Sequence, residues 1–495
     1  MSIDSAAAVI RSDDSRLTAV RPTARQVAWQ SMEFYSFIHF GMNTMTDREW
    51  GLGNEDPALF DPRSLDVDQW MRAFAAAGMT GVIITAKHHD GFCLWPSAVT
   101  EHSVAASPWL NGEGDLLRLI AESASKFGLK LGIYLSPWDR TEPSYGSGAA
   151  YDDFFVAQLE EVLTGYGPVF SVWFDGANGE GSDGRVQEYD WERYYATIRR
   201  LQPDAVISVC GPDVRWCGNE AGHTRANEWS VVPAELRDIE RIADKSQQVD
   251  DGEFSRAVHS DDDDLGSRQA LAGHIDDLVW YPAEVNTSIR PGWFYHHNED
   301  HLVRSAEELL ELWHNAVGGN ACLLLNVPPD ERGLLADPDV AALEGLGARI
   351  AALSERVLPA EPTVSSGGIE TDAGDIRPVS DELTRAFGAA LADESWRPAV
   401  GDDVPSVVLR LSAPADVDAV VLRERIELGQ RLEAVAVFGS LDGNEVLLGE
   451  TSAVGYQRIL RVERRRVDSI RVQITASRGR PALRSVAVLE ASSAP

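Results

Sequence analysis

Histidine, aromatic and aspartate side chains recur at one position of a repeated pattern in the first half of the sequence. Each lies at, or just beyond, the carboxyl end of a short apolar run that is predicted to be a strand. These side chains are His39, His88, His89, Asp90, Tyr134, Trp138, Trp173 and Asp175. A lone strand-end histidine is usually structural, but recurrence at the same strand end indicates a shared site. Neutral imidazoles both donate and accept hydrogen bonds, which suits the vicinal hydroxyl groups of a sugar.

Carboxyl groups in the same half of the chain are candidates for acid–base chemistry. Asp175 directly follows the apolar run VFSVWF, and Gly176 after it allows the backbone to turn sharply toward a cavity. A cap for the next helix is the alternative role of a strand-end aspartate. Hydrolysis of a glycosidic bond needs a second carboxyl group, because one acts as nucleophile and the other as proton donor. Glu220, Glu228 and Glu284 are the candidates near the rim of the predicted barrel, and spacing alone does not choose among them.

The spacing of the histidines argues against a metal site. His88 and His89 would point to opposite faces of a regular strand, so both reach one cavity only if the strand ends there. Zinc sites prefer HxH or HxxxH spacings, which place both ligands on one face, and neither spacing occurs near this pair. We therefore expect neither a metal nor a cofactor. A metal-dependent hydrolase remains an alternative, with ligands drawn from His39, His88, His89 and Asp175.

Strands and helices alternate along the part of the chain that carries these residues. Seven strands are predicted at residues 36–41, 81–89, 130–136, 169–176, 205–210, 278–288 and 321–329, with segments of helical period between most of them. Residues 229–232 are predicted as one further strand, the sixth in chain order. This alternation is typical of a parallel sheet, and eight strands favour a closed (β/α)8-like barrel over an open sheet. Such barrels build their active sites at the carboxyl ends of the strands, where the side chains above lie.

The pattern changes after a predicted helix at about residues 340–356. LPAEPTVSSGG has the composition of a linker, and residues 395–495 alternate with period two in runs separated by turn residues, which is typical of a β-sandwich. We therefore predict a (β/α)8-like catalytic barrel over residues 1–355 and a linker with a β-sandwich over residues 356–495. The second domain has no histidine cluster, so a packing or accessory role is expected, with carbohydrate binding as the alternative.

Composition and charge exclude several classes of protein. Of the 495 residues, 44% are apolar and 25% are charged, as in ordinary globular proteins, and the formal net charge is −34. A charge of this sign and size repels phosphate backbones and anionic bilayers, so neither nucleic acid nor a membrane is an expected partner. The N-terminus lacks the pattern of a signal peptide and the four cysteines form no CxxC pair, so we expect a cytoplasmic protein. No feature of the sequence predicts an oligomeric state.

Four segments of the sequence together resemble a known enzyme family. EFYSFIHFGMNTMTDREWG, AKHHDGFCLWPS, LGIYLSPWD and VWFDGANGEG occur in the order found in the α-L-fucosidases of glycoside hydrolase family 29. The resemblance runs from about residue 25 to about residue 350 and implies a (β/α)8-like barrel followed by a β-sandwich. GPDVRWCGNEAG and YPAEVNTSIRPGWFYH are similar to the branch of that family that acts on α-1,3- and α-1,4-linked fucose in branched oligosaccharides.

The resemblance implies a retaining exo-α-L-fucosidase that acts on a fucosylated oligosaccharide by double displacement. It assigns Asp175 as the nucleophile and Glu220, 45 positions downstream, as the general acid/base, with Glu228 as a rival for the second role. It assigns substrate-binding roles to His39, Glu49, Trp50, His88, His89, Tyr134, Trp173, Arg215 and Trp293.

Two of the expected contacts are more specific. Arg215 is expected beside the reacting carbon, where it would help to keep Asp175 ionised. Trp293 is expected near the methyl group of fucose and, together with Glu284, beside a neighbouring galactose. A broad-specificity α-L-fucosidase and a carbohydrate-binding protein without turnover are the remaining alternatives.

Overall fold

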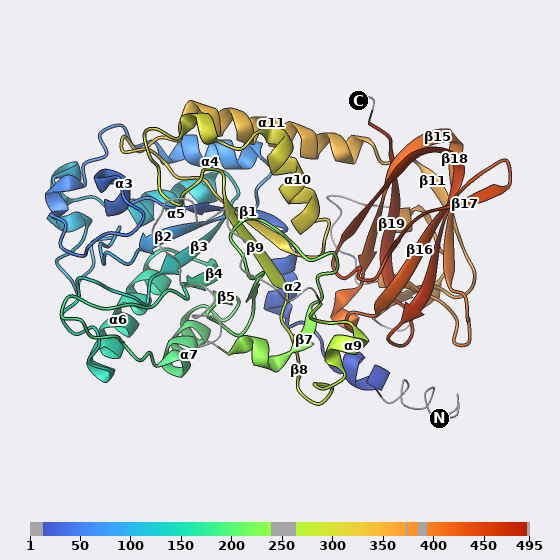
Figure 1. The fold of residues 1–495 in the computed structure, drawn as a ribbon, viewed down its shortest axis with the longest axis horizontal. Coiled ribbons are helices and arrows are strands. Elements are labelled where there is room, and N and C mark those ends of the chain that lie inside the picture. The colour runs from blue at the N-terminus through green and yellow to red at the C-terminus, as the bar shows by residue number, and fades with distance from the viewer. Residues whose placement is uncertain (1–12, 239–263, 373–374, 385–393, 493–495) are drawn as a thin grey trace.

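The amino-terminal part of the molecule is a nearly closed barrel of parallel strands. The computed structural model describes residues 13–238, 264–372, 375–384 and 394–492 (Figure 1). Within these residues, eight strands form the barrel sheet in the order β5-β4-β3-β2-β1-β10-β9-β6. The strands are β1 (Phe34–Ile38), β2 (Gly81–Lys87), β3 (Lys130–Leu135), β4 (Val169–Phe174), β5 (Val206–Val209), β6 (Arg215–Trp216), β9 (Ala283–Ser288) and β10 (Cys322–Asn326). A parallel bridge between Ser208 and Val214 brings the two ends of the sheet together, so the predicted (β/α)8-like barrel is confirmed.

Helices connect the strands on the outside of the barrel (Figure 1). They are α4 (Val67–Ala76), α5 (Leu116–Lys126), α6 (Ala149–Gly165), α7 (Trp191–Leu201), α10 (Ala306–Ala316) and α11 (Asp337–Glu355), with the shorter α2 (Ala24–Gln30), α3 (Met42–Thr46) and α9 (Arg268–Leu271). Asp66, Asp115 and Asp190 each cap a helix, because the carboxylate accepts a hydrogen bond from the third backbone N–H of that helix. Gly78 and Gly128 follow α4 and α5 with φ values of 83° and 74°, which favour glycine. None of the helices in the described part of the chain combines the length and apolarity that a membrane span requires.

The strand predicted at residues 229–232 does not belong to the barrel, so that prediction is wrong. Val231–Pro233 forms β7, which pairs antiparallel with β8 (Leu278–Trp280) in a two-stranded sheet beside the barrel. The sixth barrel strand in chain order is β6, and a strand of two residues leaves no periodicity to detect in the sequence. The apolar character of residues 229–232 has another origin, because Val231 packs in one cluster with Tyr456 of the carboxyl-terminal part.

The carboxyl-terminal part consists of antiparallel strands that enclose a second core. Its described residues form a nine-stranded sheet with β15 and β18 as long central strands. The strands are β11 (Ala360–Val364), β12 (Gly368–Thr371), β13 (Ile376–Arg377), β14 (Glu394–Arg397), β15 (Ser406–Glu424), β16 (Leu432–Leu441), β17 (Asn444–Thr451), β18 (Arg458–Ser477) and β19 (Leu483–Glu490). The register of β15 against β18 shifts between Arg410 and Ala415, and such irregularities bend strands. The sheet therefore curls around buried side chains such as Trp396, Leu409 and Val472, as a sandwich does.

The barrel and the carboxyl-terminal sheet share buried side chains. α11 ends at Glu355 and β11 begins at Ala360, so the chain passes directly from one part to the other. Five buried side chains of the sheet belong to the same apolar cluster as the barrel interior, namely Ala419, Val421, Ile459, Ala487 and Leu489. A bidentate ion pair also joins Glu311 on α10 to Arg461 on β18. The two parts are therefore joined by a continuous apolar interface with charged groups at its edge.

Candidate active site

A pocket lies at the carboxyl ends of the barrel strands, where the sequence predicts the site. The lining residues are Phe37, His39, Trp50, His88, His89, Tyr134, Trp173, Asp175, Ala177, Glu220, Asn286 and Trp293. β2 ends one residue before His88, so the adjacent His88 and His89 are free of strand geometry and both reach the pocket. The pocket thus brings together nine of the predicted site residues, whereas Glu49, Arg215 and Glu284 lie outside its lining.

Asp175 follows β4 and presents a carboxylate that is held in place on one side. Its Oδ1 accepts a hydrogen bond from the backbone N–H of Ala177 at 2.8 Å, and its Oδ2 accepts one from the Tyr134 hydroxyl at 3.0 Å. Burial raises the pKa of Asp175, while these two donors oppose the rise because they stabilise the charged form. The side chain keeps 23% of its surface exposed, so part of the carboxylate stays open to the pocket. A nucleophile needs this combination of fixed orientation and a free lone pair.

Glu220 enters the pocket from the loop after β6. Burial raises the pKa of its carboxyl group well above the ordinary value, and the negative charge of Asp175 raises it further, while a hydrogen bond from the Trp293 side chain opposes both. Its Oε2 is buried and has no hydrogen-bond partner among the described residues. A carboxyl group whose protonated form is favoured beside a second carboxylate, with one oxygen unpaired among the described residues, is suited to proton donation.

Glu228, the rival for this role, is held in an ion-pair cluster outside the pocket. Its Oε2 lies 2.9 Å from an Arg215 nitrogen, and its Oε1 lies 3.0 Å from an Arg225 nitrogen. Although burial opposes ionisation, the two guanidinium groups lower the pKa of Glu228 below its ordinary value. A doubly paired, ionised carboxylate has no proton to donate at neutral pH. The geometry therefore favours Glu220 over Glu228 as the acid/base residue.

The same ion pair shows which carboxylate Arg215 meets. The sequence predicts this guanidinium beside the reacting carbon, where it would keep Asp175 ionised. In the structure it is turned toward Glu228 and also donates to the backbone carbonyl of Trp229 at 3.3 Å. Arg215 thus lies one layer outside the pocket, and its carboxylate partner is Glu228. The groups that offset the effect of burial on the Asp175 pKa are neutral hydrogen-bond donors.

The outer hydrogen bond of His39 fixes the role of its Nε2 atom. His39 Nδ1 lies 2.8 Å from Asn326 Oδ1. The Asn326 amide nitrogen already donates to Ser288 Oγ at 2.9 Å and to the Trp293 carbonyl at 2.7 Å, so the amide oxygen is the acceptor. His39 therefore carries its proton on Nδ1, and its Nε2 is an acceptor. Burial lowers the pKa of His39 to about 3, so the ring is neutral.

The neighbouring histidine pair offers opposite groups to the pocket. His88 Nδ1 accepts a hydrogen bond at 3.2 Å from the Asn43 amide nitrogen, whose orientation is fixed because it also donates to the Glu49 carbonyl. The proton of His88 is therefore on Nε2. His89 Nδ1 lies 2.7 Å from Ser136 Oγ, whose own proton goes to a backbone carbonyl, so His89 donates from Nδ1 and presents an unprotonated Nε2. Burial lowers the pKa of both rings well below the ordinary value, and nearby ionisable groups lower it further. The three imidazoles thus offer one donor and two acceptors, which fits sugar hydroxyl groups.

Glu49 lies behind the pocket wall and holds it in place. Its carboxylate accepts hydrogen bonds from the backbone N–H groups of Trp293 at 2.8 Å and Phe294 at 3.1 Å. Glu49 also raises the pKa of His296 to about 9, so this imidazole is protonated at neutral pH and pairs with Glu49 at 2.9 Å. Glu49 thereby fixes the turn that carries the Trp293 ring. A direct contact between Glu49 and a sugar stays a prediction.

Glu284 lies inside the barrel and not at its rim. It is the second residue of β9, and its carboxylate is buried between the Tyr35 hydroxyl and the Trp173 indole N–H, the latter at 2.7 Å. The prediction that Glu284 contacts a neighbouring galactose is wrong, because β9 begins at Ala283 and turns this side chain into the barrel. Burial raises the pKa of Glu284 to about 7. Its visible role is to hold the indole of Trp173 at the base of the pocket.

Asn286 is a pocket residue that the sequence reasoning missed. It lies two positions after Glu284 on β9, so both side chains point to the same face of the strand. Its Oδ1 accepts a hydrogen bond from the Trp216 indole at 2.8 Å. The period of two in AEVNTS is the signal that identifies Asn286 once the strand is known to begin at Ala283. Phe37 was missed as well, since an apolar residue on a barrel strand gives no chemical signal.

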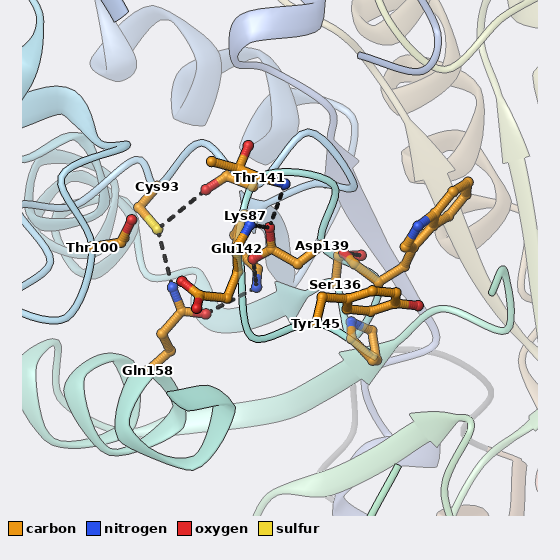
Figure 2. Close-up of polar contacts among 12 residues, drawn as sticks. Lys87, Cys93, Thr100, Ser136, Asp139, Thr141, Glu142, Tyr145 and Gln158 are labelled. Atoms are coloured by element: carbon orange, nitrogen blue, oxygen red, sulfur yellow. Dashed lines mark hydrogen bonds and ion pairs between the residues drawn. The ribbon is translucent and has the colours of Figure 1, made fainter. Parts of the chain in front are cut away.

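A second buried polar cluster lies behind the pocket, around Lys87 (Figure 2). Lys87 Nζ donates to Asp139 Oδ2 at 2.8 Å and to Gln158 Oε1 at 2.9 Å. Asp139 Oδ1 in turn accepts hydrogen bonds from the backbone N–H groups of Thr141 at 3.0 Å and Glu142 at 2.9 Å. The Lys87 and Asp139 side chains are 0% and 2% exposed. This ion pair ties the end of β2, which carries the pocket histidines, to the loop after β3.

Groups that could bind a metal are not gathered in the described ranges. No set of three or more histidine, cysteine, aspartate or glutamate side chains within them is arranged to hold an ion. The cysteines are buried free thiols, at Cys93, Cys210, Cys217 and Cys322. In the pocket, the tautomer of His88 places a proton where a metal ligand needs a lone pair.

Comparisons with known proteins agree with the geometry of the site. The sequence model of the α-L-fucosidase family matches residues 18–355. The chain is 36% identical to Alpha-L-fucosidase 1 of Arabidopsis thaliana over 445 residues, which cover 89% of this chain and 81% of the plant protein. A Ruminococcus gnavus fucosidase solved in complex with fucose is similar with a TM-score of 0.79 and 28% identity, over 96% of this chain and 95% of that one. A glycoside hydrolase family 29 member from an unknown rumen bacterium gives a TM-score of 0.75 and 33% identity, over 96% and 78%. The chain therefore belongs to the α-L-fucosidases of glycoside hydrolase family 29.

Proposed function

We propose that the chain is a retaining exo-α-L-fucosidase, with Asp175 as the nucleophile and Glu220 as the general acid/base. In the first step the Asp175 carboxylate attacks the anomeric carbon while Glu220 gives its proton to the leaving oxygen, which yields a covalent fucosyl-enzyme and the free aglycone. In the second step Glu220 takes a proton from water as the water attacks, and the Asp175 carboxylate leaves. Fucose is then released with its anomeric configuration retained.

The observation that carries this proposal is the contrast between two carboxyl groups in one pocket. Asp175 receives two hydrogen bonds that favour its charged form. Glu220 has a buried Oε2 with no hydrogen-bond partner in the described ranges, and its pKa is raised by burial and by the charge of Asp175. Burial raises the pKa of both groups, but the rise is larger for Glu220, where the charge of Asp175 adds to it. Unequal environments of this kind distinguish the nucleophile from the acid in glycoside hydrolysis.

The other lining residues support recognition of one terminal fucose. The imidazoles of His39, His88 and His89 match a set of hydroxyl groups, and Phe37 and Trp293 supply apolar surface for a methyl group. The Ruminococcus gnavus fucosidase holds fucose, and so does an Asp-to-Ala variant of that enzyme. Hydrogen bonds to hydroxyl groups that strengthen toward the transition state contribute to turnover as well as to binding.

We further propose a preference for α-1,3- and α-1,4-linked fucose in branched oligosaccharides, with broad specificity as the alternative. Support comes from residues 211–222 and 281–296, which resemble that branch of the family and supply Glu220, Asn286 and Trp293 to the pocket. With Glu284 inside the barrel, Trp293 is the candidate contact for a neighbouring galactose.

The stereochemical course tests the mechanism. Proton NMR during hydrolysis of an aryl α-L-fucoside should show α-L-fucose as the first product, because two inversions give net retention. A 2-deoxy-2-fluoro-L-fucosyl fluoride should label Asp175, as read by peptide mass spectrometry, because the fluorine slows breakdown of the covalent intermediate. First release of β-L-fucose, or a label on another residue, contradicts the mechanism.

The linkage preference is tested by the ratio of kcat/KM for a Lewis-type trisaccharide to that for 2′-fucosyllactose. We expect a ratio of at least about tenfold, because binding energy from the galactose is realised in the transition state. Trp293→Ala should reduce this ratio more than it reduces the activity on a small aryl fucoside. Equal efficiencies on the two oligosaccharides contradict the preference and leave fucosidase activity in place.

A further inference from the structure

Residues 226–230, the bridging segment, connect the active-site region to the carboxyl-terminal sheet domain. Arg458, the first residue of β18, donates to the first carbonyl of the segment at 2.6 Å and to Asn227 Oδ1 at 3.1 Å. Gln430, which lies between β15 and β16, accepts a hydrogen bond from the Ser230 N–H at 2.8 Å. The carboxyl-terminal domain therefore holds both ends of the bridging segment.

The middle of the bridging segment is also connected to the carboxyl-terminal domain by hydrogen bonds. Asn320 donates to the Glu228 carbonyl at 2.9 Å and accepts from the backbone N–H of Tyr456 at 2.7 Å, so one amide joins the segment to the carboxyl-terminal domain. Burial lowers the pKa of Arg458 to about 10, and the negative charge of Glu228 opposes that shift. The positive charge of Arg458 thus acts on the buried Glu228 carboxylate from the side of the carboxyl-terminal domain.

On its inner side the bridging segment holds the loop that carries Glu220. Glu228 pairs with Arg215, the first residue of β6, and with Arg225. Arg225 also donates to the Cys217 carbonyl at 2.8 Å, three residues before Glu220. Because these contacts are charge-assisted and buried, a shift of the bridging segment moves the loop between Arg215 and Glu220 with it.

We propose that Arg458 and Gln430 are positioning residues for the Glu220 carboxyl group and act on it through the bridging segment. The carboxyl-terminal domain then serves the chemical step in addition to packing against the barrel. This inference rests on the proposed role of Glu220 as acid/base. Proton transfer requires the carboxyl group within hydrogen-bond reach of the leaving oxygen, so a small displacement slows the departure of poor leaving groups. An interface that only packs would show the same loss for every substrate.

Two aryl α-L-fucosides with different leaving groups test the proposal. Arg458→Met removes the guanidinium group and keeps most of the apolar bulk. The matched control is Arg461→Met on the same strand, because Arg461 also crosses the domain interface but pairs with Glu311 on α10. We expect Arg458→Met to lower kcat/KM about tenfold for phenyl α-L-fucoside and less than about twofold for the 2,4-dinitrophenyl compound, which needs no protonation. Arg461→Met should change both values by less than about twofold, whereas a uniform loss or no loss with Arg458→Met overturns the proposal.

Glu220→Ala, measured on the same two substrates, separates this proposal from the role of Glu220 itself. If Glu220→Ala shows no selective loss on the phenyl fucoside, the acid assignment fails. If Glu220→Ala shows that loss and Arg458→Met does not, only the positioning proposal fails. Gln430→Leu removes another hydrogen bond between the domain and the segment, and it decides the case if Arg458→Met does not fold. A selective loss with Gln430→Leu supports the proposal, and a uniform or absent loss overturns it.

Discussion

The pocket and the cluster around Lys87 are both buried and polar, and both begin at the end of β2, yet their polar atoms are paired to different extents. In the cluster, the Lys87 ammonium group meets Asp139 and Gln158, and the carboxylate also receives two backbone N–H groups (Figure 2). In the pocket, Glu220 Oε2 has no partner in the part of the chain that the structure describes. Buried polar atoms are normally paired, so an unpaired one at a pocket marks where a ligand completes the bonding. A buried charged cluster whose polar atoms are all paired, like the one around Lys87, has a structural role.

The largest expected effect separates Asp175 in the pocket from Asp139 in the cluster. Asp175→Ala should lower kcat by at least about 10³-fold on any fucoside, because no covalent intermediate can form. Its thermal unfolding midpoint and its affinity for fucose should change little, since the side chain is partly exposed. Asp139→Ala is the matched control, with lower stability and retained chemistry in the folded enzyme. Turnover of an activated aryl fucoside by Asp175→Ala within about tenfold of the unmodified enzyme contradicts the nucleophile assignment.

The next largest effect is a loss of stability when the Lys87 cluster is disrupted. Lys87→Met should lower the free energy of unfolding by about 3–5 kcal/mol, because it leaves the Asp139 carboxylate buried without its counterion. Urea unfolding measures this loss.

The double variant Lys87→Met/Asp139→Asn is the control for the Lys87 prediction. It should recover part of the stability, since the unpaired charge is gone and the amide oxygen still accepts from the backbone N–H groups of Thr141 and Glu142. A double variant no more stable than Lys87→Met shows that stranded charge is not the cause. The pairing of Lys87 with Asp139 would then not be what makes the cluster stable.

Glu284 shares features of both regions, because it is fully paired and yet holds the pocket residue Trp173. Its pKa is raised from an ordinary 4.5 to about 7 in the folded chain, so folding favours the protonated form. The stability that this group contributes is complete below about pH 4.5 and is lost as the pH rises through about 7. Glu284→Gln removes this titration and still offers an oxygen to the Trp173 indole. Its unfolding free energy, relative to the unmodified chain, should rise by about 2–3 kcal/mol across that window.

Urea unfolding of both proteins at pH values spanning the window measures the Glu284 effect. A constant offset between the two curves is expected from the changed bond to Tyr35, so the slope with pH is the quantity that counts. Parallel curves contradict the raised pKa. Glu284→Leu is the companion variant, because it removes the acceptor for the Trp173 indole and should lower turnover where Glu284→Gln does not.

The sequence predicts most of the barrel because its longer strands carry their own pattern of apolar residues. The prediction fails at β6, because a strand of two residues leaves no pattern in the sequence. Residues 229–232 were predicted as the sixth barrel strand instead, because they are apolar where they pack against the carboxyl-terminal domain. Such a contact is long-range, so no local periodicity can reveal it.

Site residues at strand ends were easier to predict than those whose role depends on a partner. His88 and Asp175 follow long strands directly, so their position at the pocket follows from the strand pattern. Glu284 was misplaced because β9 begins later than the apolar pattern suggests. Arg215 was placed beside Asp175, but its carboxylate partner is Glu228, and partner choice depends on how loops pack. The sequence therefore predicts which strand end a side chain occupies better than which group it meets.

Removal of metals is expected to have no effect on activity, which makes it the smallest of the expected effects. The pocket histidines are the groups most easily mistaken for metal ligands, since His39, His88 and His89 meet in one cavity. Asn43 donates to His88 Nδ1, so a proton occupies the His88 Nε2 position that a metal would require, and hydroxyl groups fit the resulting mixture of donor and acceptors better than a cation does. Dialysis against a strong chelator should leave kcat/KM on an aryl fucoside unchanged, and added zinc or manganese should not increase it. Activity that is lost on chelation and returns with a metal would overturn the assignment of these imidazoles to sugar hydroxyl groups. It would also contradict the view that the pocket, unlike the Lys87 cluster, offers polar atoms to a sugar.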